Sequence, residues 1–185
     1  MKNFIKRYPG LILLSFISIL VCVLNFVPNT FLSGWDTIHP EFDFKEYFGR
    51  VFSIWQQHQG LGAVASQAHA SELPRLLIYF PFSFFVPIES LRYLYFFLCL
   101  LIGPVGVYFF VKEIVKSNIS FTSREVVAFV CGLFYLLNLT TLQQFFVPLE
   151  MFATHYATLP YLFLFATKYL LNLDKKHLFY FVITN

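Results

Sequence analysis

The residue types best suited to acid–base chemistry gather in one polar stretch of this chain, residues 34–74. The stretch contains five of the ten acidic residues and three of the five histidines. A carboxylate can accept the proton of a hydroxyl group while that hydroxyl attacks an activated carbon atom. Asp36 is the first acid of the stretch, and we expect it to be a catalytic general base. The alternative for Asp36 is a structural role in a turn, where Asp is common.

Two more acids follow Asp36 closely and differ in their expected roles. Asp43 stands directly before a segment with helical apolar periodicity, residues 44–58, and Glu46 follows three residues later. This pattern is typical of a helix N-cap, so we expect a mainly structural role for Asp43. Glu41 is the second candidate catalytic acid, and its alternative is to bind an acceptor or a metal ion.

Side chains that can hydrogen-bond a phosphate or stack on a sugar form a second group of candidates. The residues assigned to substrate binding are His39, His69, Trp35, Trp55, Arg75 and Arg92. Each type has a structural alternative: a histidine satisfied within the fold, a tryptophan anchored at a membrane interface, or an arginine that reaches back to water. The acids and His39 lack a familiar metal-ligand spacing, so no metal ligand and no cofactor is assigned, with a divalent cation as an open alternative.

The composition predicts a membrane protein. Of 185 residues, 58% are hydrophobic and only 12% are charged, and the mean hydropathy is +0.66. Soluble domains usually carry about 25% charged residues. The net charge of +3 comes without a dense basic cluster, so nucleic acid is not an expected partner. The three cysteines lie far apart inside apolar runs, where small buried side chains explain them better than disulfide or metal chemistry.

Apolar runs predict four full membrane spans and a truncated fifth: residues 11–27, 91–111, 126–137 or somewhat beyond, 156–171 and 177–183. The first run is interpreted as a retained span and not as a cleaved signal peptide, because no small-residue cleavage site follows it. Lys2, Lys6 and Arg7 place the N-terminus in the cytoplasm, and the basic residues at 112–124 and 175–176 mark further cytoplasmic segments of a multi-pass plasma-membrane protein. Because the fifth run is incomplete, we expect residues 1–185 to be the N-terminal part of a longer domain.

The loop between the first two spans, residues 29–90, is then on the outer face. Residues 44–58 predict an amphipathic helix on the membrane surface, ended by the glycines of Gly60–Gly62. Residues 76–86 are apolar but too short to cross, and we interpret them as a half-inserted helix, with one thin, kinked span as the alternative. The predicted fold is therefore all-α: a polytopic transmembrane helix bundle with interfacial helices in a long first outer loop.

Three motifs in this loop resemble the GT-C superfamily of membrane glycosyltransferases. They read G-W-D-x-x-x-P-E-x-D-F at residues 34–44, W-Q-x-x-x-G-L-G at 55–62, and A-H-A-x-x-L-P-R at 68–75. Their order is similar to that of the N-terminal GT-C region of bacterial arabinofuranosyltransferase-like proteins. The outer stretch at residues 138–155 is expected to be broken by Pro148, and the broken outer segment that begins at Leu137 is also similar to that group. The resemblance covers most of the chain.

The resemblance implies transfer of a sugar from a polyprenyl-phosphate donor to a cell-envelope glycan on the outer face of the membrane. It places the catalytic acid early in the first outer loop, where Asp36 matches best, and the expected partners are the lipid bilayer, the lipid-linked donor and the glycan acceptor. The alternative is a non-catalytic membrane protein, either a transporter or an assembly subunit for envelope polysaccharide. A transporter should carry polar groups at the middle of its spans, whereas here the polar residues concentrate in the loop.

Overall fold

The computed structural model describes residues 7–34, 39–57, 60–64, 72–115 and 120–185. In these ranges the chain forms eight α-helices, one short 3-10 helix and one hairpin of two-residue strands. The predicted all-α class is confirmed, since the hairpin is the only sheet in the described part. The chain divides into two compact units, called here the helical unit (residues 1–27, 33–35 and 96–185) and the loop unit (28–32 and 36–95).

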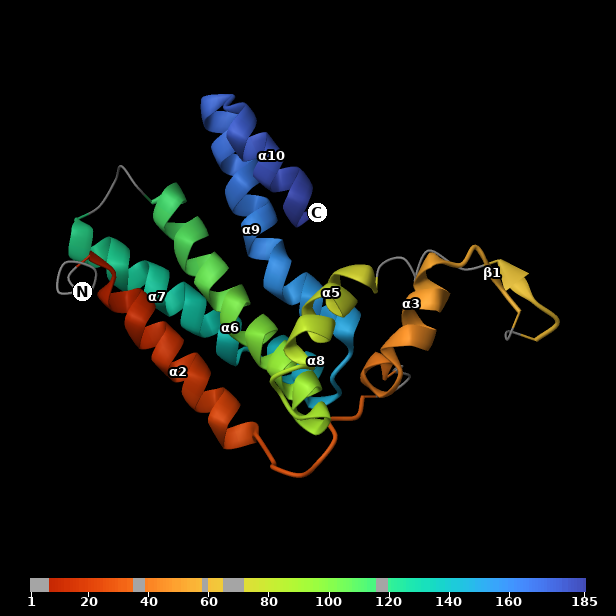
Figure 1. Cartoon of the computed structure of the whole chain (residues 1–185). Helices are drawn as coiled ribbons and strands as arrows, with labels where there is room; N and C mark the ends of the chain where they lie inside the picture. Colours follow the sequence, from red (N-terminus) through yellow and green to blue (C-terminus); the bar gives the residue numbers. More distant parts are fainter. Residues whose placement is uncertain (1–6, 35–38, 58–59, 65–71, 116–119) are drawn as a thin grey trace. The chain divides into compact units, whose positions relative to one another are not determined.

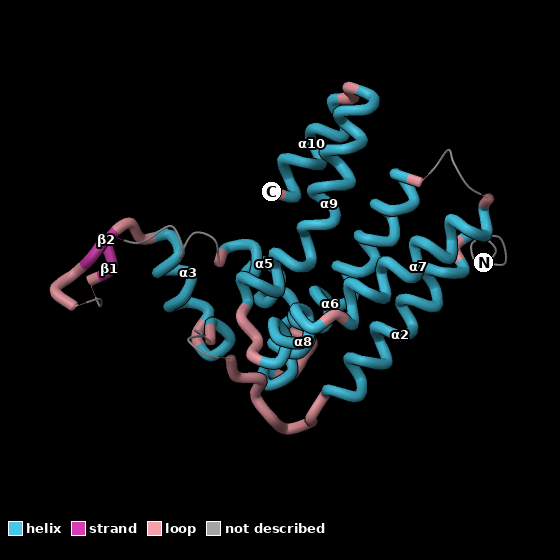
Figure 2. The backbone as a smooth tube through the Cα atoms, turned by 180° about the vertical axis from the view of Figure 1, so that it is seen from behind, coloured by secondary structure: helices cyan, strands magenta, loops and turns pink. Residues whose placement is uncertain are grey.

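The helical unit contains most of the long helices. They are α2 (Pro9–Asn25), the larger part of α6 (Ile88–Ile114), α7 (Phe121–Leu137), α8 (Leu139–Phe146), α9 (Glu150–Asn172) and α10 (Lys175–Thr184). Figures 1 and 2 show α2 lying alongside α7, and α10 folding back along α9. The helices α9 and α10, which a short connection joins, therefore run antiparallel.

Local sequence explains several of the helix ends. Pro9 opens α2, where its missing N–H is not needed. The Ser120 hydroxyl accepts a hydrogen bond from the Ser123 N–H at 3.2 Å and caps α7. Leu173, with φ of 52°, adopts the left-handed conformation that ends α9. These caps are encoded within a few residues of each end.

The crossing of three helices depends on the absence of a side chain at Gly132 in α7. A Cβ atom there would lie 2.5 Å from Leu14 Cδ2 of α2 and 3.2 Å from the Pro104 carbonyl oxygen of α6. Small residues allow helices to approach closely in this way. Leu14 is fully buried, so there is little room for it to move aside.

A buried carboxylate ties the same three helices together. Glu125 of α7 accepts hydrogen bonds from the Tyr108 hydroxyl at 2.6 Å and from the Gly10 N–H at 3.3 Å. It also forms an ion pair with Lys112 of α6. A buried charge is tolerated when it is paired and hydrogen-bonded, and Glu125 meets both conditions.

The expected spans are found as helices, but with different boundaries. The segment predicted to return inward at residue 156 begins as a helix at Glu150, and the preceding stretch, which was expected on the outer face, contains the unpredicted helix α8. The predicted break at Pro148 is confirmed, because it falls between α8 and α9. The apolar helices α2 and α5 have only 17 and 10 residues, which is short for a crossing.

Within the described residues, α6 is long and apolar enough to cross a membrane by itself. A second crossing is counted only if α7 and α8, bent by 42° at their junction, form one span. The number of spans in the bundle therefore stays a prediction.

The loop unit contains a 3-10 helix η1 (Pro40–Phe42), the helices α3 (Phe44–Phe52) and α5 (Leu73–Phe82), and the start of α6. The predicted N-cap is confirmed, since the Glu46 N–H donates to Asp43 Oδ1 at 2.9 Å. The apolar face of α3 packs on α5 through Tyr47, Val51 and Leu76. This face is thus at least partly covered by protein.

The predicted end of the amphipathic helix is wrong. The helix was expected to reach residue 58, but α3 ends at Phe52, and the chain turns into the strands β1 (Trp55–Gln56) and β2 (Ala63–Val64), which pair antiparallel (Figure 2). Gly60 and Gly62, with φ of 59° and 99°, lie in the connection between the strands. These conformations favour glycine, so the glycines make a hairpin and do not stop the helix.

The predicted half-inserted helix at residues 76–86 is present in a shifted position. It is α5, which begins at Leu73 and ends at Phe82, with Pro81 in its last turn. Proline lacks the N–H of a helical hydrogen bond, and the helix ends one residue after it. Its depth in a membrane stays a prediction.

We predict that Gly132→Val lowers the thermal unfolding midpoint of the purified chain by several degrees. The added side chain must displace Leu14 or separate α2 from α6 and α7, which typically costs about 1–3 kcal/mol. Val130→Leu is the control, since Val130 lies in the same helix and is exposed. An unchanged midpoint for Gly132→Val would show that this crossing is not tightly packed.

Candidate functional site

Three of the eight predicted site residues, Trp35, Asp36 and His69, lie outside the described residues. The other five all belong to the loop unit: His39, Glu41, Trp55, Arg75 and Arg92. The structure brings three of these together in one cluster and places Arg75 and Trp55 in other surroundings.

His39, Glu41 and Arg92 form what we call the buried cluster. His39 directly precedes the 3-10 helix η1, and Glu41 lies within it. Pro40 fixes the backbone at the first position of this short helix. The tight turn brings His39 Nδ1 to 2.8 Å from Glu41 Oε1. Arg92, in the second turn of α6, places Nη1 at 2.9 Å from His39 Nδ1 and 3.1 Å from Nε2.

The Nδ1-protonated tautomer of His39 can make one hydrogen bond to each neighbour, and the 2.9 Å approach of Arg92 Nη1 to Nδ1 is then a contact between two donors. With its proton on Nδ1, the imidazole donates to Glu41 Oε1 and accepts at Nε2 from the Arg92 guanidinium. Arginine has no acceptor, so it can only be the donor in this pair. The hydrogen bond at one ring nitrogen thereby fixes the state of the other.

Burial makes the cluster energetically demanding. Arg92 is 1% exposed, and the Glu41 side chain is also 1% exposed. A buried charge requires a partner, and here the charges of the carboxylate and the guanidinium are linked through the imidazole. Glu41 Oε2 is buried and makes no hydrogen bond to any described residue. The Glu41 carboxylate therefore has one acceptor oxygen that the described residues leave unused.

Arg75 does not reach back to water, which was the alternative to its predicted role in substrate binding. It was expected to bind a lipid phosphate or to reach back to water, but it is 4% exposed and forms an ion pair with Glu72. Its guanidinium also lies over the Tyr79 ring, 5.7 Å from the centroid. The side chain is buried in the loop unit, so it does not reach back to water. Phosphate binding by Arg75 stays a prediction.

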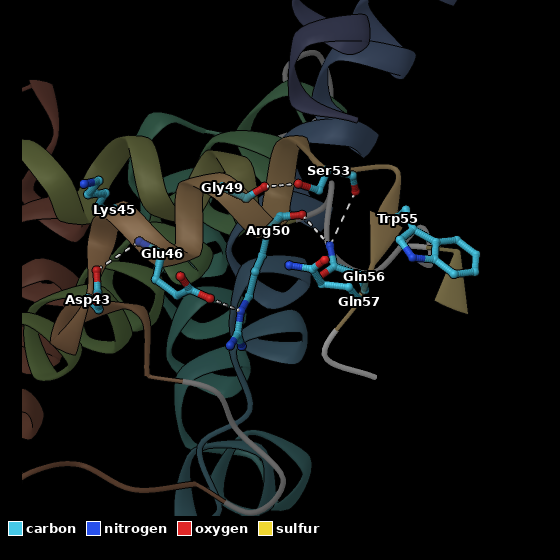
Figure 3. A pocket seen from close by; sticks show the side chains of 9 residues that line it. All are labelled: Asp43, Lys45, Glu46, Gly49, Arg50, Ser53, Trp55, Gln56 and Gln57. Atoms are coloured by element: carbon cyan, nitrogen blue, oxygen red, sulfur yellow. Dashed lines mark hydrogen bonds and ion pairs between the residues drawn. The ribbon is translucent and has the colours of Figure 1, made fainter. Parts of the chain in front are cut away.

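The polar face of α3 lines a cavity of about 480 Å³, called here the α3 pocket. Nine residues of α3, its N-cap and the following strand segment surround it: Asp43, Lys45, Glu46, Gly49, Arg50, Ser53, Trp55, Gln56 and Gln57 (Figure 3). Gln56 is buried and donates from Nε2 to the Arg50 carbonyl oxygen at 2.8 Å. This bond fixes the start of the hairpin against the end of α3.

Gly49 is an unusual residue for the middle of α3. Glycine in a helix interior costs about 1 kcal/mol relative to alanine. Apart from its chain neighbours and the backbone of its own helix, no described atom lies within 4 Å of the place where a Cβ would stand, so packing against other elements does not require a glycine there. The space that a side chain would fill at position 49 is part of the α3 pocket.

Trp55 lies at one end of this pocket, but its ring does not turn inward. Figure 3 shows the indole pointing away from Glu46 and Arg50. A Cβ on Gly62 would lie 2.4 Å from Trp55 Cζ2, so the ring packs closely on the bare backbone of the hairpin. Trp55 is still 57% exposed, and sugar stacking on it stays a prediction.

The α3 pocket was not found by sequence reasoning. The interpretation of residues 44–58 as one helix hid the turn that brings Ser53, Gln56 and Gln57 to one place. The available signal was Gly49, a helix-disfavouring residue on the polar side of an otherwise regular amphipathic helix.

Comparison with known proteins adds no relative: no family model, no curated protein and no solved structure matches this chain. Among the described residues, no group of three or more His, Cys, Asp or Glu side chains is arranged to hold a metal ion. The chemistry of the site has to be argued from its own geometry.

We predict that Arg92→Leu strongly destabilises the loop unit, whereas Arg50→Leu has little effect. Removing Arg92 leaves a buried His39–Glu41 pair without its cation, and loss of one partner from a buried ion pair costs about 3–5 kcal/mol. Arg50 is the control, because it is partly exposed and its pair with Glu46 is of the kind that contributes about 0.3–0.5 kcal/mol. The measurement is protease sensitivity of residues 28–95 in the purified chain. Equal sensitivity of the two variants would contradict a stabilising role for the buried cluster.

Proposed function

We propose that the chain is part of an inverting membrane glycosyltransferase that moves a sugar from a polyprenyl-phosphate donor to a cell-envelope glycan on the outer face. The observation that carries the proposal is the buried cluster. It shows a loop whose polar residues are built into a defined arrangement, immediately after the Gly34-Trp35-Asp36 motif. The sugar is arabinofuranose-like or another pentose or hexose.

In the proposed reaction, a hydroxyl oxygen of the acceptor attacks the anomeric carbon of the donor sugar. The bond between that carbon and the lipid phosphate breaks, and the polyprenyl phosphate leaves with the electron pair. Asp36 takes the proton of the attacking hydroxyl. The reaction needs one base, and no cofactor is part of the proposal.

Glu41 fits a positioning role better than a direct one. Its side chain is almost fully buried and holds His39 through Oε1, so an acceptor hydroxyl would not meet it first. Together with Arg92, it fixes His39, which comes three residues after Asp36 in the sequence. A base must stay within hydrogen-bond reach of its substrate, and a fixed neighbour in the sequence supports the role proposed for Asp36.

The proposal includes a polytopic bundle in the plasma membrane, with the N-terminus in the cytoplasm. The apolar span α6 supports it, as do the exposed apolar side chains along α2, among them Phe16, Val23 and Leu24. Large contiguous apolar surfaces are rare on soluble monomers and are satisfied by lipid. The lipid bilayer is thus the first proposed partner, followed by the lipid-linked donor and the glycan acceptor.

One observation favours the second candidate, a transporter or an assembly subunit for envelope polysaccharide. The α7–α8 pair is bent by 42°, and a cavity of about 620 Å³ lies at the bend. Broken helices beside cavities are common in transporters. The side chain of Asn138 satisfies backbone groups at the break, accepting from the Thr141 N–H at 3.0 Å and donating to the Tyr135 carbonyl oxygen at 2.9 Å.

The lining of this cavity argues for the transferase instead. It contains aromatic, aliphatic, amide and hydroxyl side chains, and His155 is the one titratable group besides tyrosine among the described lining residues. The walls that the structure describes therefore carry no acid–base pair for coupled transport. Reconstituted vesicles separate the two candidates. A transferase gives glycosylated product from the lipid-linked donor, whereas a transporter moves the glycan without forming a new bond.

We predict that Asp36→Asn lowers the sugar-transfer rate of the full-length protein by about 10²- to 10⁴-fold, which is the usual contribution of a positioned base. Asn is similar in size and tolerated in turns, so folding and donor binding should be kept. Transfer is measured with radiolabelled lipid-linked sugar, and donor binding is measured separately.

The control for this substitution is Asp174→Asn, which keeps a helix N-cap at an exposed position of the helical unit. Near-normal transfer in Asp36→Asn would remove Asp36 from the mechanism and make Glu41 the next residue to test. Loss of folding and donor binding together would instead favour the structural role in a turn.

We predict that cysteines at Leu61 and Thr122 react with a membrane-impermeant maleimide from opposite sides of the membrane. Both positions are exposed, and the proposed topology places Leu61 outside and Thr122 inside. The native cysteines Cys22, Cys99 and Cys131 are first replaced by alanine. Reaction of both positions in intact cells would overturn the proposed topology.

A further inference from the structure

We propose that the α3 pocket binds uncharged sugar residues of the acceptor glycan, and that Gly49 lets the sugar approach the helix backbone. In calling this glycan an acceptor, the inference rests on the proposed glycosyltransferase function. The binding itself is argued from four features of the pocket: its charge balance, its mixture of donors and acceptors, its bare backbone and its size.

The charges around the pocket cancel. Two acids, Asp43 and Glu46, and two bases, Lys45 and Arg50, belong to the same lining. A site for a phosphate or a carboxylate would need an excess of positive charge, and a site for a cation would need an excess of acids. A balanced, polar lining fits an uncharged ligand.

The lining offers donors and acceptors next to one another. Arg50 Nε donates to Glu46 Oε1 at 3.3 Å, and this bond joins one atom of each group (Figure 3). A guanidinium has further N–H groups, and a carboxylate has a second oxygen. Neighbouring hydroxyls of a sugar can donate to the carboxylate and accept from the guanidinium at the same time. The Gln57 amide, which adds one more donor and acceptor, lies beside them.

Gly49 is the feature that a solvated helix face does not explain. Most of the pocket's side chains suit any exposed polar face, but glycine disfavours the helix and packs against no described atom. A ligand that comes close to the backbone explains it, because any side chain at this position would occupy its place. Gly49 lies one turn before Ser53, whose hydroxyl donates to the Gly49 carbonyl oxygen at 2.6 Å.

The size of the pocket agrees with a small ligand. Its volume of about 480 Å³ lies within the range of about 300–1,000 Å³ found for small-molecule sites. It is fixed on one side by α3, which packs on α5, and on the other by the bond from Gln56 to the Arg50 carbonyl oxygen. The pocket is therefore held by packing and hydrogen bonding within the loop unit.

The experiment uses the full chain in lipid nanodiscs and an array of uncharged oligosaccharides built from pentofuranose and hexopyranose residues. The tightest-binding array member is then titrated against the unsubstituted chain, Gly49→Ala and Arg50→Lys. Inorganic phosphate and Ca²⁺ are the charged probes. Lys175→Gln is the control, because it removes an exposed charge from the helical unit.

We expect Gly49→Ala to weaken glycan binding at least tenfold while the thermal midpoint stays the same or rises. Alanine favours the helix, so a loss of binding without a loss of stability separates a blocked pocket from a damaged fold. Arg50→Lys should weaken binding as well, since lysine keeps the charge but loses the planar fork. Lys175→Gln should bind as the unsubstituted chain does.

Unchanged binding in Gly49→Ala would overturn the inference, as would a chain that binds no array member or binds only phosphate or Ca²⁺. A failed transfer assay is a different result. If Asp36→Asn transfers sugar normally but Gly49→Ala loses glycan binding, the catalytic assignment fails and the binding pocket stands. If transfer depends on Asp36 and binding is unaffected by Gly49→Ala, the pocket fails and the proposed reaction stands.

Discussion

The loop unit buries the positive charge of Arg92, and its structure depends on pairing that charge. Arg92 is almost fully enclosed, and an isolated guanidinium in such a place would be strongly unfavourable. His39 and Glu41 provide the compensation, and both come from a turn that is more than 50 residues away in sequence. These polar contacts thus attach the turn at residues 39–41 to the first turns of α6. The placement of that turn follows from the need to pair Arg92.

The helical unit applies the same rule to a carboxylate. Glu125 is buried between three helices and is satisfied by Lys112, Tyr108 and the Gly10 N–H. Near it, Gly132 permits the close approach that apolar packing requires. Partnered charges fix which helices meet, and small residues fix how closely they meet. Apolar side chains fill the remaining interior of the unit, but their contacts specify less strictly which helices pack together.

The α3 helix serves two purposes with its two faces. Its apolar face packs on α5 and gives the loop unit a small core, while its polar face lines the α3 pocket. A short helix with so small a core can tolerate few unfavourable residues. The glycine at position 49 is therefore more telling here than it would be in a long helix.

What the sequence by itself determined about this protein is local. Apolar runs and caps predicted that helices exist near residues 11–27, 91–111 and 126–137, and the Asp43 cap and the break at Pro148 were confirmed, since each depends on neighbours within one turn. Tertiary structure decided the rest. The end of α3 at Phe52, the hairpin and the burial of Arg75 and Arg92 depend on segments distant in the chain. Periodicity cannot report such contacts, because it records which face is apolar and not what covers it.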